Sequence, residues 1–88
     1  MLRFIPHHAL PLPMIAHTVA HVRAHGPNIR SKRERQGYGL RRFAALVDVS
    51  PAHLSRIERG QRGAQPEVIQ RIARGLGVEI TDIADLSA

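Results

Sequence analysis

The segment from Leu40 to Gly60, LRRFAALVDVSPAHLSRIERG, constrains the fold of this chain more than any other stretch. Its first half places apolar side chains at i, i+3, i+4 and i+7, the spacing of one helix face, at Leu40, Phe43, Ala44 and Val47. Asp48 then breaks the period, and Ser50-Pro51 is typical of an N-cap followed by proline in the first turn of a new helix. Gly60 is suited to ending that second helix in a left-handed conformation. The segment therefore predicts two short helices joined by a tight turn, which need a surrounding bundle to be stable.

The size and charge of the chain favour a binding surface over a deep active site. With 88 residues and no cysteine, it has room for one domain with a modest core and for no disulfide or thiolate metal site. Residues 27–75 carry eleven basic and four acidic side chains, whereas residues 76–88 carry three acidic and no basic ones. A basic field of this kind suits a phosphate backbone, although from charge alone a solvated basic face is equally compatible with it.

The chain has no apolar run long enough to span a membrane, and prolines interrupt the apolar start that a signal peptide would need. We therefore expect a soluble, cytoplasmic protein without a membrane partner.

The rest of the sequence predicts a compact all-α domain of five helices. Residues 1–13 contain three prolines and no period, as in a disordered arm, and residues 14–25 have the spacing of a short amphipathic helix ended by Gly26-Pro27. Further helices are expected over residues 28–36, 66–76 and 81–86, in addition to the two described above. No strand is expected, because alternation of apolar and polar residues never persists. The predicted division is an N-terminal extension, disordered or partly helical, over residues 1–26 and a folded domain over residues 27–88.

Several short motifs recur at fixed spacing between residues 28 and 86, and together they resemble a known family. They are Ala44, Val49-Ser50, the run Leu54-Ser55-Arg56-Ile57-Glu58 with Gly60, and Pro66-Glu67 with Ile69 and Leu76-Gly77-Val78. This part of the chain resembles the Cro and phage-repressor type of helix-turn-helix domain, a bacterial family that includes xenobiotic-response-element-like regulators. The resemblance implies a lambda-repressor-like DNA-binding domain and a sequence-specific transcriptional regulator of double-stranded DNA, as a rule a repressor. It also implies a structural ion pair between Arg33 and Glu58, partly buried rather than exposed.

Positions that contact DNA in this family carry over to the present sequence residue by residue. The helix 51–59 would lie in the major groove, with base contacts from Pro51, Ala52, Ser55 and Arg56. Arg56 is the strongest candidate, because its guanidinium can bind guanine O6 and N7 together; the alternatives are a phosphate contact or a surface salt bridge with Glu58 or Asp48. Phosphate contacts are expected from the backbone N–H groups near Leu40 and from Arg41, Arg42, His53, Arg59, Gln61 and Arg62.

The partners implied are double-stranded DNA and a second copy of the chain. The homodimer surface could lie on the C-terminal helix with Ile80, Ile83 and Leu86, or on the segment Met14 to Val22. Two other roles are open: an antitoxin that binds both operator DNA and a toxin, and a protein-interaction module that has lost DNA binding.

Metal binding and catalysis have little support in the sequence. His17, His21 and His25 are spaced one helical turn apart and are weak candidates for a shared Zn²⁺ or Ni²⁺ ion, but no Asp, Glu or Cys supports them locally. No phosphate loop, carboxylate pair or activated nucleophile is present, so we expect no cofactor and no enzymatic activity.

Overall fold

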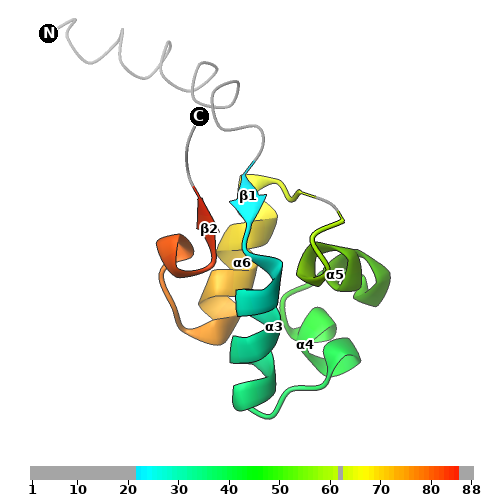
Figure 1. The fold of residues 1–88 in the computed structure, drawn as a ribbon. Coiled ribbons are helices and arrows are strands. Elements are labelled where there is room, and N and C mark those ends of the chain that lie inside the picture. Colours follow the sequence, from blue (N-terminus) through cyan, green and yellow to red (C-terminus); the bar gives the residue numbers. More distant parts are fainter. Residues whose placement is uncertain (1–21, 62, 86–88) are drawn as a thin grey trace, which may run out of the picture.

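The computed structural model describes residues 22–61 and 63–85. In order, they form strand β1 (Arg23–Ala24), helices α3 (Gly26–Arg35), α4 (Leu40–Leu46), α5 (Pro51–Glu58) and α6 (Pro66–Leu76), the 3₁₀ helix η1 (Ile80–Asp82) and strand β2 (Ala84–Asp85) (Figure 1). Helices α4 and α5 lie on one side of the domain, and the strand pair and η1 lie on the other (Figure 1).

Proline marks the start of three helices. Pro27, Pro51 and Pro66 all occupy the first turn, where a missing N–H costs nothing and the fixed φ suits the helix. Two of these starts, at Pro51 and Pro66, agree with the sequence prediction. Gly26-Pro27, predicted to end a helix, instead begins α3, because proline is tolerated in the first turn of a helix.

Each of the helices α3 to α6 is followed by a residue of positive φ that reverses the chain. After α3, α5 and α6 this residue is a glycine, whereas after α4 it is Asp48, with a φ of 59°. The Val49 N–H donates to the Ala44 carbonyl (2.9 Å), and the Asp48 N–H donates to the Ala45 carbonyl (3.3 Å). These two bonds form the pattern that closes a helix end around a left-handed residue. The turn between α4 and α5 is thus a regular helix stop built on a residue that adopts this conformation at some cost.

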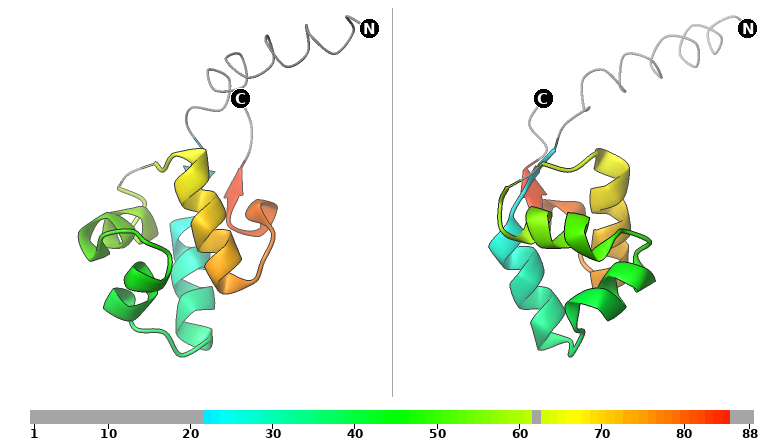
Figure 2. Two further views of the ribbon diagram at one scale, coloured as in Figure 1. Left: turned by 180° about the vertical axis from the view of Figure 1, so that it is seen from behind. Right: turned by 90° about the vertical axis from the view of Figure 1, so that its right-hand side faces the viewer.

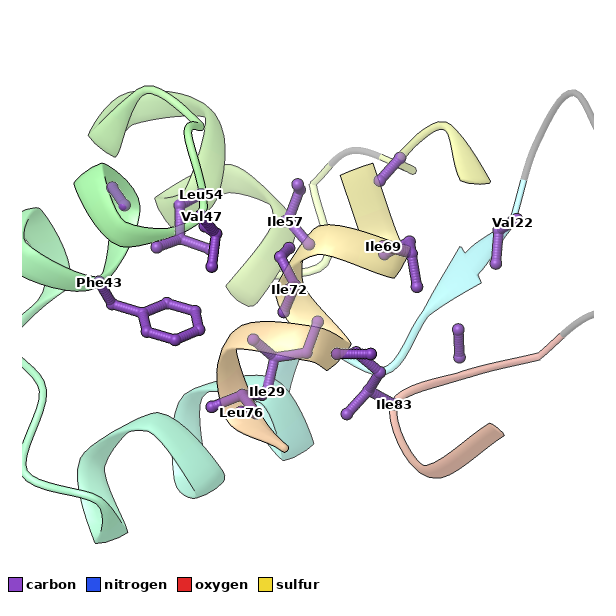
Figure 3. Packing of buried hydrophobic residues seen from close by; sticks show 14 residues of the cluster. Val22, Ile29, Phe43, Val47, Leu54, Ile57, Ile69, Ile72, Leu76 and Ile83 are labelled. Atoms are coloured by element: carbon purple, nitrogen blue, oxygen red, sulfur yellow. The ribbon is translucent and has the colours of Figure 1, made fainter. Parts of the chain in front are cut away.

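The core lies where α3, α4 and α5 face α6 (Figure 3). The largest fully buried side chains come from all four helices and from the residue after η1; they are Ile29, Phe43, Leu54, Ile57, Ile69, Ile72 and Ile83. The predicted inner face of α4 is confirmed for Phe43, Ala44 and Val47, while Leu40 and Val49 are half-buried. The short helices thus gain their stability from a shared apolar centre.

The structure differs from the predicted all-α fold in two places, one in the N-terminal extension and one in the last of the five expected helices. Residues 22–24, expected near the end of a short helix over residues 14–25, are extended, and β1 pairs antiparallel with β2, with Arg23 opposite Asp85 and Ala24 opposite Ala84. The predicted helix 81–86 is replaced by η1 and β2 in its described part. Residues 14–21 and Leu86 lie outside the described residues.

The physical reason is the shortness of these segments. Isolated helices shorter than about 12 to 15 residues are marginal in water, so tertiary contacts decide the conformation of both segments. Val22 is buried and bridges Ala64, and the His25 N–H donates to the Ile83 carbonyl at 2.7 Å. Extended backbone allows both ends of the domain to pair while Val22 and Ile83 fill the core.

Asp48 offers a direct test of the strained turn. Asp48→Gly is expected to raise the free energy of unfolding by about 0.5 to 1 kcal/mol, because glycine removes the steric cost of positive φ while adding some entropy to the unfolded chain. Asp48→Ala should lower it by a similar amount. Urea denaturation of the three proteins measures both changes, and a stabilising alanine would contradict this account of the turn.

Candidate nucleic-acid interface

The chain from α4 to α5 forms a helix-turn-helix whose second helix is capped at its start. The Ser50 hydroxyl oxygen accepts a hydrogen bond from the His53 backbone N–H at 3.1 Å, and Pro51 occupies the first turn. Viewed from the side of these two helices, α5 lies across the front of the domain, with α3 to one side of it and α6 to the other (Figure 2). The inner face of α5 is therefore covered, and its other face is turned outward.

The residues of α5 divide between these two faces. Leu54 and Ile57 have no exposed surface, and Glu58 is buried. Of the predicted base-contacting residues, Pro51 and Ala52 are exposed and Ser55 and Arg56 are half-buried. All four lie on one short helix and away from the fully buried core.

Two polar side-chain atoms of α5 lie buried without a hydrogen-bond partner among the described residues, namely His53 Nε2 and Arg56 Nε. The predicted alternative of a salt bridge from Arg56 to Glu58 or Asp48 is not found among the described ion pairs, and the Glu58 carboxylate binds Arg33 instead. The guanidinium of Arg56 is thus not committed to a carboxylate in the described part of the chain.

The predicted phosphate-contacting residues lie around this helix. Arg41 and Arg42 are exposed at the start of α4, where the backbone N–H groups near the half-buried Leu40 precede the first helical hydrogen bond. The Arg42 guanidinium carbon is 5.6 Å from the centre of the Tyr38 ring, a cation–π distance that limits its freedom. Arg59 and Gln61 are exposed after α5, His53 is half-buried, and Arg62 lies outside the described residues.

A buried ion pair connects α5 to α3. Arg33 Nε donates to Glu58 Oε2 (2.7 Å) and Arg33 Nη2 to Glu58 Oε1 (2.9 Å), while Nη1 donates to the Tyr38 carbonyl (2.8 Å). The two side chains are only 7% and 4% exposed. The hydrogen bonds with Glu58 raise the pKa of Arg33, against the opposing effect of burial. The pair is the one implied by the family resemblance, and it fixes the end of α5 against the last turn of α3.

Comparison with known proteins identifies this arrangement. A family model described as helix-turn-helix, HTH_3, matches residues 29–83. The chain belongs to this Cro/C1-type helix-turn-helix family.

Relatives of this HTH_3 protein include named regulators. The HTH-type transcriptional regulator SlrR of Bacillus subtilis is 34% identical over 61 residues, which cover 68% of this chain and 40% of SlrR. The chain thus spans less than half the length of that relative. The restriction-modification controller protein C.AhdI from Aeromonas hydrophila superposes with a TM-score of 0.64 at 25% identity, covering 76% of this chain and 96% of that one. The master regulator for biofilm formation SinR, solved in complex with DNA, gives a TM-score of 0.62 at 26% identity, covering 65% and 95%.

The predicted histidine cluster falls largely outside the described residues of the HTH_3 protein. His17 and His21 are not described, and His25 Nε2 lies 3.1 Å from Asp85 Oδ1, beside the strand pair. Within residues 22–61 and 63–85, no group of three His, Cys, Asp or Glu side chains could hold a metal ion. In the same part of the chain, no helix is long and apolar enough to cross a membrane.

Two side chains that sequence reasoning missed connect helix ends in the HTH_3 fold. Gln36 Nε2 donates to the Leu76 carbonyl (2.8 Å) at the end of α6. Arg71 donates to the carbonyls of Val47 (2.9 Å) and Asp48 (3.0 Å) in the turn before α5. Backbone carbonyls carry no residue signature, so no sequence pattern indicated either contact.

Removing one charge of the buried pair should destabilise the domain strongly. Glu58→Gln leaves the Arg33 guanidinium buried without its counter-charge, which is expected to cost about 3 to 5 kcal/mol of unfolding free energy. Glu34→Gln is the matched control, because Glu34 pairs with Arg30 at the surface (3.1 Å) and such pairs contribute at most about 1 kcal/mol. Equal losses in chemical denaturation for both variants would contradict the assigned role of the buried pair.

Proposed function

We propose that this protein is a sequence-specific regulator of transcription that binds double-stranded DNA and reads the major groove with α5. The observation that carries the proposal is the division of α5: Leu54, Ile57 and Glu58 fix it in the bundle, while the outward face presents Ser55 and Arg56. Membership of the HTH_3 family and the likeness to SinR, a protein solved with DNA, support it. The proposed role is binding without catalysis.

Base recognition is assigned to four residues of α5. Arg56 has the chemistry for the most selective contact, because a forked guanidinium can donate to O6 and N7 of one guanine. Its guanidinium is in no described ion pair, so its terminal Nη groups are not committed to a carboxylate, whereas its Nε is buried. Ser55 can contact several bases, whereas Pro51 and Ala52 offer only apolar contact with a thymine methyl group.

Phosphate contacts are assigned to the positions that flank α5. Before α5 in the sequence, the start of α4 supplies Arg41 and Arg42. Within α5 and after it, the candidates are His53, Arg59, Gln61 and Arg62. Backbone N–H groups near Leu40 add a partial positive charge at the same end of α4. If a protomer neutralises four or five phosphates, the affinity of a dimer should fall with salt at a log–log slope of roughly −7 to −9.

We further propose that the protein acts as a homodimer and as a repressor. A single module of this size buries little DNA surface, and two copies on adjacent half-sites give the affinity that specific binding needs. Repression is proposed because the family resemblance, which as a rule implies a repressor, favours it over activation.

The dimer surface we propose lies between α6 and η1. Of the residues predicted for that surface, Ile83 is fully buried within its own protomer, and Val22 of the rival segment is buried as well. Near the half-buried Ile80, a shallow hollow is lined by Gln70, Ala73, Arg74, Val78, Glu79 and Ile80. Arg74 and Glu79 flank its apolar residues with opposite charges. We propose a two-fold axis that passes between these two residues, so that Arg74 of each copy faces Glu79 of the other and the contact is reciprocal, as in an isologous interface.

Replacing Arg56 tests base recognition. Arg56→Ala is expected to relax the preference at one base pair per half-site, at a cost of about 1 to 3 kcal/mol for that base, in selection of bound duplexes from a random pool. Arg41→Ala is the control, since loss of a phosphate contact weakens all sequences alike and reduces the salt slope by about one. An Arg56→Ala protein that selects the unaltered binding site would refute the assignment, and an unaltered protein that selects no site would refute the function.

Charge exchange tests the dimer surface. Arg74→Glu and Glu79→Arg are each expected to reduce the mass seen by light scattering from that of a dimer to that of a monomer, because like charges then meet across the axis. The double variant should restore the dimer. Glu79 also caps η1, so a monomeric Glu79→Arg protein could reflect loss of this cap rather than loss of the contact. The double variant is therefore the deciding one, and a double variant that stays monomeric counts against this surface.

A further inference from the structure

The turn between α4 and α5 is held from outside by one side chain of α6. The hydrogen bonds that close α4 use the carbonyls of Ala44 and Ala45, which leaves the Val47 and Asp48 carbonyls pointing out of the helix end. Arg71 donates Nε to the Val47 carbonyl (2.9 Å) and Nη2 to the Asp48 carbonyl (3.0 Å). A single guanidinium therefore binds the carbonyl of the C-cap residue Val47 and that of the left-handed residue after it.

These contacts are the main ones that Arg71 makes in the described part of the chain. Its Nη1 lies 3.6 Å from a Glu67 carboxylate oxygen, but Glu67 is 71% exposed and one turn earlier on the same helix. Surface pairs of this type contribute little. The bonds to the turn are charge-assisted and form the stronger part of the interaction.

The neighbouring turn of α6 is shaped to receive the same helix end. Gly75 follows Arg71 by four residues and lies on the same side of α6. A Cβ atom at Gly75 would come within 2.5 Å of Val47 Cγ1 and 3.3 Å of the Phe43 ring. The end of α4 thus contacts α6 through backbone at Gly75 and through the guanidinium of Arg71, two independent features that fix the same turn.

We propose that Arg71 is a positioning residue for DNA recognition: by clamping the Val47–Asp48 turn, it sets the orientation in which α5 presents Ser55 and Arg56. Asp48 adopts a conformation that is unfavourable for a residue with a side chain, so the turn needs an external partner to stay in one geometry. Without the clamp α5 remains attached to the core, but its outer face samples a range of orientations. Bidentate base contacts need a fixed geometry of donors and acceptors, whereas the electrostatic attraction to phosphate is independent of sequence, so selectivity is lost before affinity. This inference rests on the proposed function.

The experiment compares Arg71→Gln with Arg35→Gln, a matched control that removes the same charge. Arg35 is exposed in the last turn of α3 and makes no side-chain hydrogen bond or ion pair within the described residues. The full chain is first used to select a preferred duplex from a random pool. The affinity for that duplex is then divided by the affinity for a scrambled duplex of equal composition, which gives a specificity ratio for each protein.

We expect Arg71→Gln to lower this ratio about tenfold, the size of effect that loss of charge-assisted hydrogen bonds produces. Arg35→Gln should stay within about twofold of the unaltered protein, as is usual for a surface substitution. The specificity ratio of Arg71→Lys should lie between the ratios of these two variants, because an ammonium group cannot bind both carbonyls in the way that a guanidinium does. This variant also keeps the test decisive if Arg71→Gln unfolds.

A rescue variant separates positioning from a direct DNA contact by Arg71. Glycine at position 48 favours the same turn without the clamp, so Asp48→Gly combined with Arg71→Gln should regain most of the specificity ratio. No recovery in the double variant, or equal ratios for Arg71→Gln and Arg35→Gln with the preferred site retained, would overturn this inference alone. Absence of any preferred site for the unaltered protein overturns the proposed function and this inference with it.

Discussion

The bidentate pair between Arg33 and Glu58 is the contact on which the outward presentation of α5 depends. It is formed between the last turn of α3 and the last residue of α5, and a third donor of the same guanidinium binds the Tyr38 carbonyl before α4. Buried ion pairs add little net stability, because desolvation offsets the attraction. Their geometry is nevertheless strict, since any rotation of α5 would leave a charge buried without its partner. The pair therefore contributes more to the uniqueness of the helix orientation than to the free energy of folding.

Because the ion pair adds little net free energy of folding, most of the stability of the domain comes from apolar packing. Helices of seven to eleven residues are too short to persist alone, and each of the four buries one face against the others around α6 (Figure 3). Polar contacts to backbone carbonyls then fix the helix ends: Gln36 holds the end of α6, and Arg71 holds the end of α4. The result is a rigid inner structure with a polar outer helix face, which is what a recognition surface requires.

The sequence predicted the parts of this structure that depend on local rules. Proline and cap residues marked the starts of α5 and α6, and the spacing of Phe43, Ala44 and Val47 predicted the buried face of α4. Prediction failed where long-range contacts decide the conformation. Val22 and Ile83 are apolar residues that fit a helix or a strand equally well, and two-residue strands are too short to show alternation. The hydrogen bonds from Arg71 to backbone carbonyls could not be predicted from the sequence either, because any residue at positions 47 and 48 would supply the same acceptors.

The antiparallel pair of β1 and β2 has a consequence for the order of folding. Helical turns and the contacts between successive helices close short loops, whereas Arg23 and Asp85 are joined across nearly the whole described chain. Closing this long loop has the largest entropic cost of any contact among the described residues, and only a few hydrogen bonds offset it. We therefore expect the helices to assemble first and the strand pair to close last, and to open first when the domain loosens. The two ends of the domain are thus its least cooperative part, while the helix-turn-helix lies within the part that folds and unfolds as one unit.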